Sequence, residues 1–435
     1  MQAFRAHLIH SPERGRIERI EDALVSFDDT GQITSVAPGD SAPATMDLRA
    51  RGVLLPGLID LHIHAPQFPQ LGTGLDLPLE DWLFKYTFPL EARFANIAYA
   101  RGVHDRLVRR LLANGTTTAV YFATIHDASC LDLARTCLRL GQRAFVGRVA
   151  MDLADSCPEY YRDADAAASV SGTARFIEAV RALPQNALVE PIITPRFIPA
   201  CSDAALEGLG ALAAETGAAV QTHCSESDWE HAHVLSRTGK TDTAALDSFG
   251  LLNRRTVLAH AGHITGADME LIAGRGAGIA HCPLSNAYFG NAVFPLRRAL
   301  AKALHIGLGT DISGGHSAFL LDNARAAVTA SRMLEDGTDP EKGAAERGAA
   351  GSRIDFRDAF YLATKGGAEV LDLPAGAFEP GRQMDAILVD LQDDFGPPED
   401  LLQKIIMRAT PDEIVTTWVA GRAVSGKDRP PVQSV

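Results

Sequence analysis

The stretch VLLPGLIDLHIH, from Val53 to His64, joins an apolar run to two histidines that are separated by one residue. The run from residue 53 to residue 60 is short and almost wholly apolar, which is typical of a strand buried on both faces. His62 and His64 follow it, and their side chains point to the same side of an extended chain because side chains alternate along a strand. This stretch predicts a buried parallel strand that carries two imidazoles at its carboxyl end.

Seven further runs of this kind follow, at residues 117–123, 144–151, 188–193, 218–222, 256–259, 276–280 and 306–310. Segments with helical spacing of apolar residues lie between them, for example at 97–113 and 203–215. Strand and helix that alternate eight times predict the α/β class and a (β/α)₈ TIM barrel. We expect a helix at 355–370 to close this barrel.

The two ends of the chain have a different pattern, with short alternating runs broken by glycine and proline, which is typical of antiparallel strands. Neither end is long enough for a core of its own. We therefore expect one small β-sandwich domain built from both termini, residues 1–55 and 376–435, beside a barrel formed by residues 56–375.

Charge and composition exclude several classes of partner. The 435 residues include 41 Lys and Arg against 54 Asp and Glu, a net charge of −13, which argues against a nucleic-acid or anionic membrane partner. No apolar run approaches the roughly 20 residues of a membrane span, and the N-terminus has no signal-peptide core. The six cysteines form no C-x-x-C pair, so we expect free thiols and a cytoplasmic location.

Polar residues that can bind a metal follow several predicted strands: His223 and Glu226 after the fifth, His260 after the sixth, and Asp311 after the eighth. The carboxyl ends of barrel strands meet on one face, so these groups should converge with His62. Imidazoles and a carboxylate suit zinc or iron, and an open position on such a metal activates water. A lone histidine is more often structural, but this ordered combination predicts a metal centre.

These motifs resemble the amidohydrolase superfamily over nearly the whole chain. Within it, the resemblance is to the guanine deaminase family. The segments that carry it are His64-Ala65-Pro66-Gln67, GTGLDLPLEDWLFKYTFPLEARF (72–94), NGTTTA (114–119), TPRFIP (194–199), THCSES (222–227), AHCPLSN (280–286) and GTDISGG (309–315).

The resemblance implies an enzyme that deaminates guanine at C2 to xanthine and ammonia, and a homodimer. It implies one zinc ion per subunit, with iron as the alternative, bound by His62, His64, His223 and Asp311. His260 would either ligate the metal weakly or contact its water. Glu226, Asp311 and His260 would be catalytic, and the substrate would contact His64, Gln67, Arg196, Phe197, His223, Glu226 and Asp311.

Residue chemistry agrees with these roles. Asp311 can accept a proton from water, and Glu226 can deliver one to N3 and to the departing amine. The guanidinium fork of Arg196 suits a carbonyl oxygen, and the carboxamide of Gln67 suits a lactam edge. Without the motif, Arg196 would be read as a structural ion pair and Phe197 as core. Trp82 and Tyr86 could wall the pocket or serve packing.

Other functions remain open from sequence. No lysine ends the third or fourth predicted strand, which argues against the binuclear enzymes that use a carboxylated lysine. A related aminohydrolase acting on another purine, a pterin or a triazine is the second hypothesis. A catalytically silent scaffold is the third, and it is disfavoured because every expected metal ligand is present.

Overall fold

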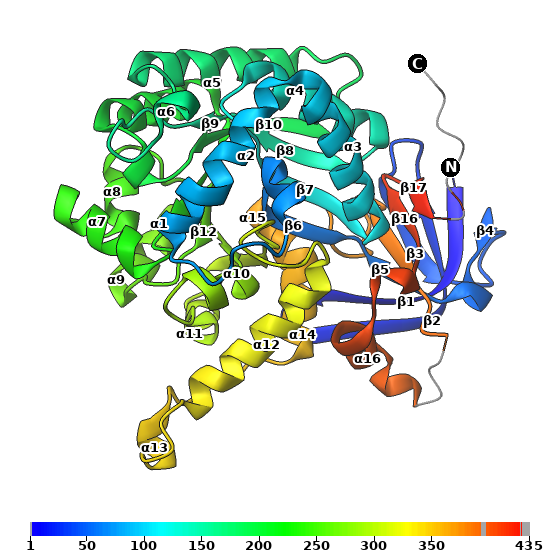
Figure 1. Cartoon of the computed structure of the whole chain (residues 1–435). Coiled ribbons are helices and arrows are strands. Elements are labelled where there is room, and N and C mark those ends of the chain that lie inside the picture. Colours follow the sequence, from blue (N-terminus) through cyan, green and yellow to red (C-terminus); the bar gives the residue numbers. More distant parts are fainter. Residues whose placement is uncertain (1, 393–396, 427, 429–435) are drawn as a thin grey trace.

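The structure, a computed structural model, describes residues 2–392, 397–426 and 428, and these residues form two β-sheets (Figure 1). The larger sheet is parallel and has the order β14-β13-β12-β11-β10-β8-β7-β6. Its strands are β6 (Leu58–His64), β7 (Thr116–Phe122), β8 (Arg143–Gly147), β10 (Val189–Pro195), β11 (Ala219–Cys224), β12 (Thr256–His260), β13 (Gly278–His281) and β14 (His305–Leu308), with β9 (Val149–Ala150) beside β10.

The first and last strands of this sheet meet and close a barrel. The backbone N–H of Asp311 donates to the carbonyl of His62 at 2.8 Å, and that of His64 donates to Ile312 at 2.8 Å. The segment that follows β14 is therefore fixed against β6, where two of the predicted metal ligands lie. The predicted (β/α)₈ barrel is confirmed.

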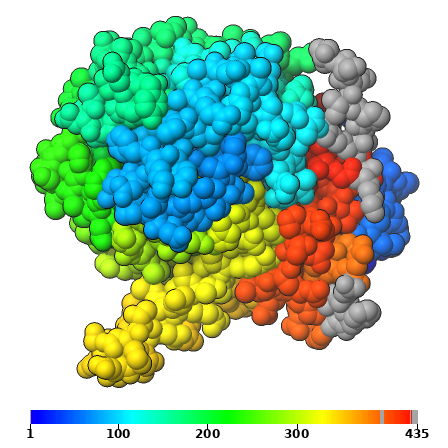
Figure 2. All heavy atoms as spheres, in the orientation of Figure 1, coloured from blue at the N-terminus to red at the C-terminus, as the bar shows by residue number. Residues whose placement is uncertain are grey.

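Helices connect the strands and cover the outside of the barrel (Figure 1). Their apolar faces fit the buried strands, as in α3, where Val103, Leu107 and Leu111 are fully buried. The main helices are α3 (Ile97–Ala113), α4 (Asp127–Leu140), α5 (Ala166–Arg181), α6 (Asp203–Thr216), α7 (Asp228–Thr238), α8 (Asp242–Ser248), α9 (Gly266–Arg275), α10 (Pro283–Phe289), α11 (Leu296–Ala301) and α12 (Leu320–Asp336). Figure 2 shows that the carboxyl-terminal end of α12 and the short α13 (Ala344–Arg347) project from the body of the molecule.

The second sheet joins both ends of the chain, in the order β17-β16-β15-β5-β1-β2-β3, with β4 beside β1. Its central pairing, β5 against β15, brings residue 53 opposite residue 389. Phe4, Phe27 and Trp418 pack in its core. The strands are β1 (Gln2–Glu13), β2 (Arg16–Phe27), β3 (Ile33–Pro38), β4 (Met46–Asp47), β5 (Val53–Pro56), β15 (Ala386–Val389), β16 (Ile414–Val419) and β17 (Arg422–Gly426).

One sequence-based boundary was wrong. The run at 53–60 is not one strand, because Gly57 separates β5 of the terminal sheet from β6 of the barrel. His62 and His64 consequently lie within β6 and not after it. The helix predicted at 355–370 is present: α14 (Phe356–Tyr361) continues through a π-helical turn, Leu362–Gly366, into α15 (Gly367–Val370).

Two expectations from composition can be compared with the fold. Within the described part of the chain, no helix has the length and apolar character that a membrane crossing requires. All six cysteines are buried free thiols. Burial raises the pKa of Cys130 to about 11, which leaves this thiol protonated at neutral pH.

Gly210 of α6 is a position where packing and not propensity decides the residue. A Cβ there would overlap the carbonyl oxygen of Phe249. We expect Gly210→Ala to destabilise the protein by about 1–3 kcal/mol through overpacking, seen as a lower Tm. The control is Gly102→Ala in α3, where a Cβ meets open space and should stabilise by about 0.5–1 kcal/mol. Equal Tm changes in the two variants would contradict this account.

Candidate active site

Four histidines and one aspartate converge at the carboxyl end of the barrel. His62 and His64 come from β6, His223 from β11, His260 from the end of β12, and Asp311 from the loop after β14. All five side chains are buried. Three overlapping groups of these residues and Glu226 bring possible ligand atoms within 4.8 Å of one another. This convergence of strand ends is the placement that the sequence predicted.

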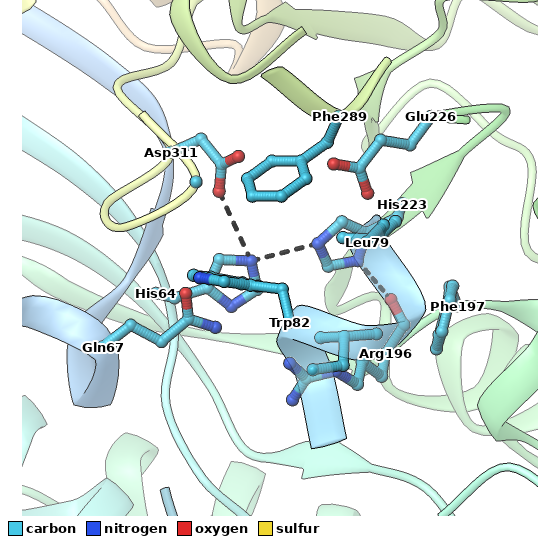
Figure 3. Close-up of a pocket in the computed structure, with 12 residues that line it drawn as sticks. His64, Gln67, Leu79, Trp82, Arg196, Phe197, His223, Glu226, Phe289 and Asp311 are labelled. Carbon is cyan, nitrogen blue, oxygen red and sulfur yellow. Dashed lines mark hydrogen bonds and ion pairs between the residues drawn. The ribbon is translucent and has the colours of Figure 1, made fainter. Parts of the chain in front are cut away.

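The distances fit a shared ion. His64 Nε2 lies 3.0 Å from His223 Nε2 and 3.6 Å from Asp311 Oδ1 (Figure 3). His62 Nε2 lies 3.3 Å from Asp311 Oδ1. Ligand atoms about 2.1 Å from a tetrahedral zinc lie roughly 3.4 Å from each other. His260 Nε2 is more distant, 3.9 Å from Asp311 Oδ2. The cluster is therefore a His/Asp metal-binding site.

Hydrogen bonds and burial prepare the histidines to be ligands. His223 donates from Nδ1 to the carbonyl of Arg196 at 2.5 Å, and His260 Nδ1 lies 2.9 Å from Asn286 Oδ1. These bonds leave the Nε2 lone pairs free toward the site. Burial lowers the pKa of all four imidazoles, so they are neutral, as metal ligation requires. Among the described residues, His62 Nε2 and His260 Nε2 are buried without a hydrogen-bond partner, which fits a site that binds an ion.

The backbone at the strand ends is held in an uncommon conformation. Ser225, His260 and Asp311 have φ values of 50°, 69° and 48°, in the left-handed region. Such residues cost about 1–3 kcal/mol each and concentrate at functional sites. The surrounding hydrogen bonds enforce them: Asp60, for example, accepts from Thr310 N at 2.9 Å and from Thr310 Oγ1 at 2.6 Å. These conformations destabilise the fold slightly, but they direct the side chains into the site.

Glu226 faces the same site from the loop after β11. Its Oε1 lies 3.6 Å from His260 Nε2. Burial, followed by the charge of Asp311, raises the pKa of Glu226 to about 8. Its backbone N–H donates to Glu230 Oε2 at 2.8 Å, which anchors the loop. The arrangement holds a protonated carboxyl group beside the metal-binding site.

A pocket opens onto this cluster (Figure 3). All seven residues that the sequence nominated for substrate binding line it: His64, Gln67, Arg196, Phe197, His223, Glu226 and Asp311. Leu79, Trp82, Leu83 and Phe289 supply apolar walls. Trp82 is therefore a pocket residue and Tyr86 is not, although both side chains lie near Gly74. The pocket combines flat apolar surfaces with a few fixed polar groups.

Arg196 is part of a buried network. It donates from Nη1 to Glu91 Oε2 at 2.7 Å and from Nη2 to Glu91 Oε1 at 3.3 Å. Gln67 donates to Glu91 Oε1 at 2.8 Å, and its own carbonyl accepts from Ser313 N at 3.2 Å. Burial alone would lower the pKa of Arg196, but Glu91 outweighs it and the pKa lies above its ordinary value. Arg196 is thus both ion-paired and part of the pocket wall. The two interpretations of this residue from sequence, a structural ion pair and a pocket residue, are therefore compatible.

Sequence reasoning missed three residues of this site. Glu91 is fully buried in α2 (Phe88–Ala92), Asn286 fixes His260, and Asp60 ties β6 to the loop of Asp311. Glu91 had a visible signal, since it is a single acid between apolar residues in FPLEARF (88–94). Asn286 had none, because its contact with His260 depends on how α10 packs.

The comparisons with known proteins agree with this site. A model of the amidohydrolase family matches residues 53–424. The guanine deaminase of Homo sapiens is 36% identical over 449 residues, which cover 97% of this chain and 96% of that protein. The guanine deaminase of Escherichia coli K12 is 32% identical and covers 88% of this chain and 85% of that protein.

Solved structures of guanine deaminases are also similar to this chain. The guanine deaminase of C. acetobutylicum, which has guanine bound in its active site, has a TM-score of 0.88 and 31% identity. The alignment covers 97% of this chain and 99% of that one.

Proposed function

Because the chain belongs to the amidohydrolase family, and its relatives above are guanine deaminases, we propose that it hydrolyses guanine at C2 to xanthine and ammonia. It is a hydrolase that acts on a C–N bond of a cyclic amidine. The observation that carries the proposal is the single pocket in which Gln67 and Arg196 stand beside Glu226 and the metal-binding cluster.

Zinc is the proposed metal. Nitrogen ligands from His62, His64 and His223 with one oxygen ligand from Asp311 suit zinc, and iron is compatible with the same set. When bound, the ion would supply an activated water as the nucleophile. His260 would contact that water, since its Nε2 lies farther from Asp311 than those of His62 and His64 do.

Proton transfer falls to the two acids. Asp311 accepts a proton from the attacking water and orients it toward C2. N3 of the purine must gain a proton as C2 becomes tetrahedral, and the amine must gain one as it leaves. Glu226 carries the required proton at neutral pH because its burial raises its pKa to about 8. It can recover one proton from Asp311 before the amine leaves and one from the hydroxyl group on C2 as the carbonyl forms, so that both acids return to their starting states.

Purine recognition falls to Arg196, Gln67 and Phe197. Arg196 uses two of its five N–H groups on Glu91, which leaves donors for a carbonyl oxygen such as O6. Gln67 has a second amide N–H beyond the one given to Glu91. The ring of Phe197 and the apolar walls would hold the flat base and exclude water.

Replacing Arg196 tests recognition. We expect Arg196→Ala to lower kcat/KM for guanine by about 10²-fold or more, because a donor to the substrate is lost and Glu91 becomes an unpaired buried charge. Steady-state kinetics and metal content measure the effect. A matched control is Arg175→Ala, an exposed arginine of α5. Wild-type guanine turnover by Arg196→Ala would refute this role.

The proposed activity is tested by ammonia release from guanine, adenine, cytosine and a pterin in parallel, with xanthine identified as the product of guanine. Guanine should be turned over fastest. Faster turnover of another base would support the second hypothesis, a related aminohydrolase. The homodimer, the cytoplasmic location and the domain boundaries at 55/56 and 375/376 stay predictions.

A further inference from the structure

Glu91 has no part in the reaction proposed above, although it forms part of the wall behind the pocket. Its side chain is fully buried, and its carboxylate accepts three hydrogen bonds from pocket residues, two from Arg196 and one from Gln67. Burying an ionised carboxylate has a high free-energy cost unless the charge is paired, so a role for Glu91 is expected.

The pair changes what the pocket offers to a ligand. Arg196 alone would present a full positive charge in a buried wall, where water and salt screen poorly. With Glu91 bound through both carboxylate oxygens, the wall keeps N–H donors but has no net charge from this pair. N–H donors in a wall without net charge can bind a neutral carbonyl group, and they do not attract an anion more strongly than a neutral ligand.

Substrate and product differ in this respect. Guanine is neutral near neutral pH, whereas xanthine, with a second ring carbonyl at C2, loses a proton in that range. An unpaired arginine would hold the anionic product and slow its release. Resting on the proposed function, we propose that Glu91 is a positioning and specificity residue that neutralises Arg196, so that the pocket favours a neutral purine over an anionic product.

Binding of two inhibitory purines tests this proposal. Dissociation constants for xanthine and hypoxanthine are measured at one mildly alkaline pH, where xanthine is mostly an anion and hypoxanthine is neutral. The wild-type protein should bind xanthine no more tightly than hypoxanthine. Glu91→Gln removes the charge at nearly constant size and should shift the ratio toward xanthine by about tenfold or more.

Glu91→Asp is the matched control, because it keeps the charge and should keep the wild-type ratio. A purely structural role would weaken both purines alike in Glu91→Gln and leave the ratio unchanged, which would overturn the proposal. If Glu91→Gln does not fold, the wild-type protein decides, since a clear preference for xanthine over hypoxanthine would also overturn it. Failure of wild-type guanine turnover would instead refute the proposed function.

Discussion

Glu226→Gln is expected to bind metal as the wild type does and to lose about 10²- to 10⁴-fold in turnover of guanine. Glutamine keeps the size and burial of the side chain, so the fold and the metal-binding cluster should be intact. It cannot release a proton to N3 or to the amine. Burial raises the pKa of Glu226 to about 8, which favours a protonated carboxyl group that can act as an acid.

Three measurements separate this role from a structural one. Metal content per chain and Tm should match the wild type, and single-turnover kinetics should place the loss in the chemical step. Glu178→Gln, the same change at an exposed position of α5, should behave as wild type. Full activity of Glu226→Gln with bound metal would show that another group transfers the proton.

The barrel was predictable because its strands are buried on both faces. Such strands are continuous apolar runs, and each was separated from the next by a helical pattern. The same rule explains the error at 53–60, where β5 and β6 are both apolar and adjacent although they belong to different sheets. Nothing in the periodicity of one run tells which sheet it joins.

The π-helical turn within the helix at 356–370 has a packing cause that cannot be read from the periodicity of the sequence. A Cβ at Gly366 would lie 2.7 Å from the carbonyl oxygen of Ile306, and one at Gly367 would lie 2.9 Å from Ile59 Cγ2. The two glycines let this segment approach β14 and β6 closely, and the π-helical turn Leu362–Gly366 lies at this approach. Sequence periodicity alone predicted a helix here, but not its π-helical turn.

The candidate site was predictable where strand ends alone define it. His62, His223, His260 and Asp311 converge because barrel topology requires it. Glu91 and Asn286 depend instead on loops and short helices whose positions arise from tertiary packing. The sequence could therefore predict the groups that line the pocket, but not the groups that hold them in place.

Metal removal is expected to abolish turnover of guanine, and Zn²⁺ should restore it in proportion to the metal bound. The proposed ligands come from β6, β11 and the loop after β14, so an ion there would also tie three parts of the barrel together. A ligand present at 100 times its Kd stabilises the folded state by about 2.7 kcal/mol. The metal-free protein should therefore show a lower Tm as well as no activity.

Histidine variants make this test specific to the site. His223→Ala removes a proposed ligand and should lose both metal and turnover, whereas His305→Ala alters a half-buried histidine at the amino end of β14 and should keep both. The two variants remove the same side chain from opposite ends of the barrel strands, and only the carboxyl end carries the proposed metal-binding cluster. Restoration by Fe²⁺ in place of Zn²⁺ would revise the identity of the metal but not the requirement for one. Undiminished activity in demonstrably metal-free protein would instead refute the mechanism, which requires a metal ion to activate water at neutral pH.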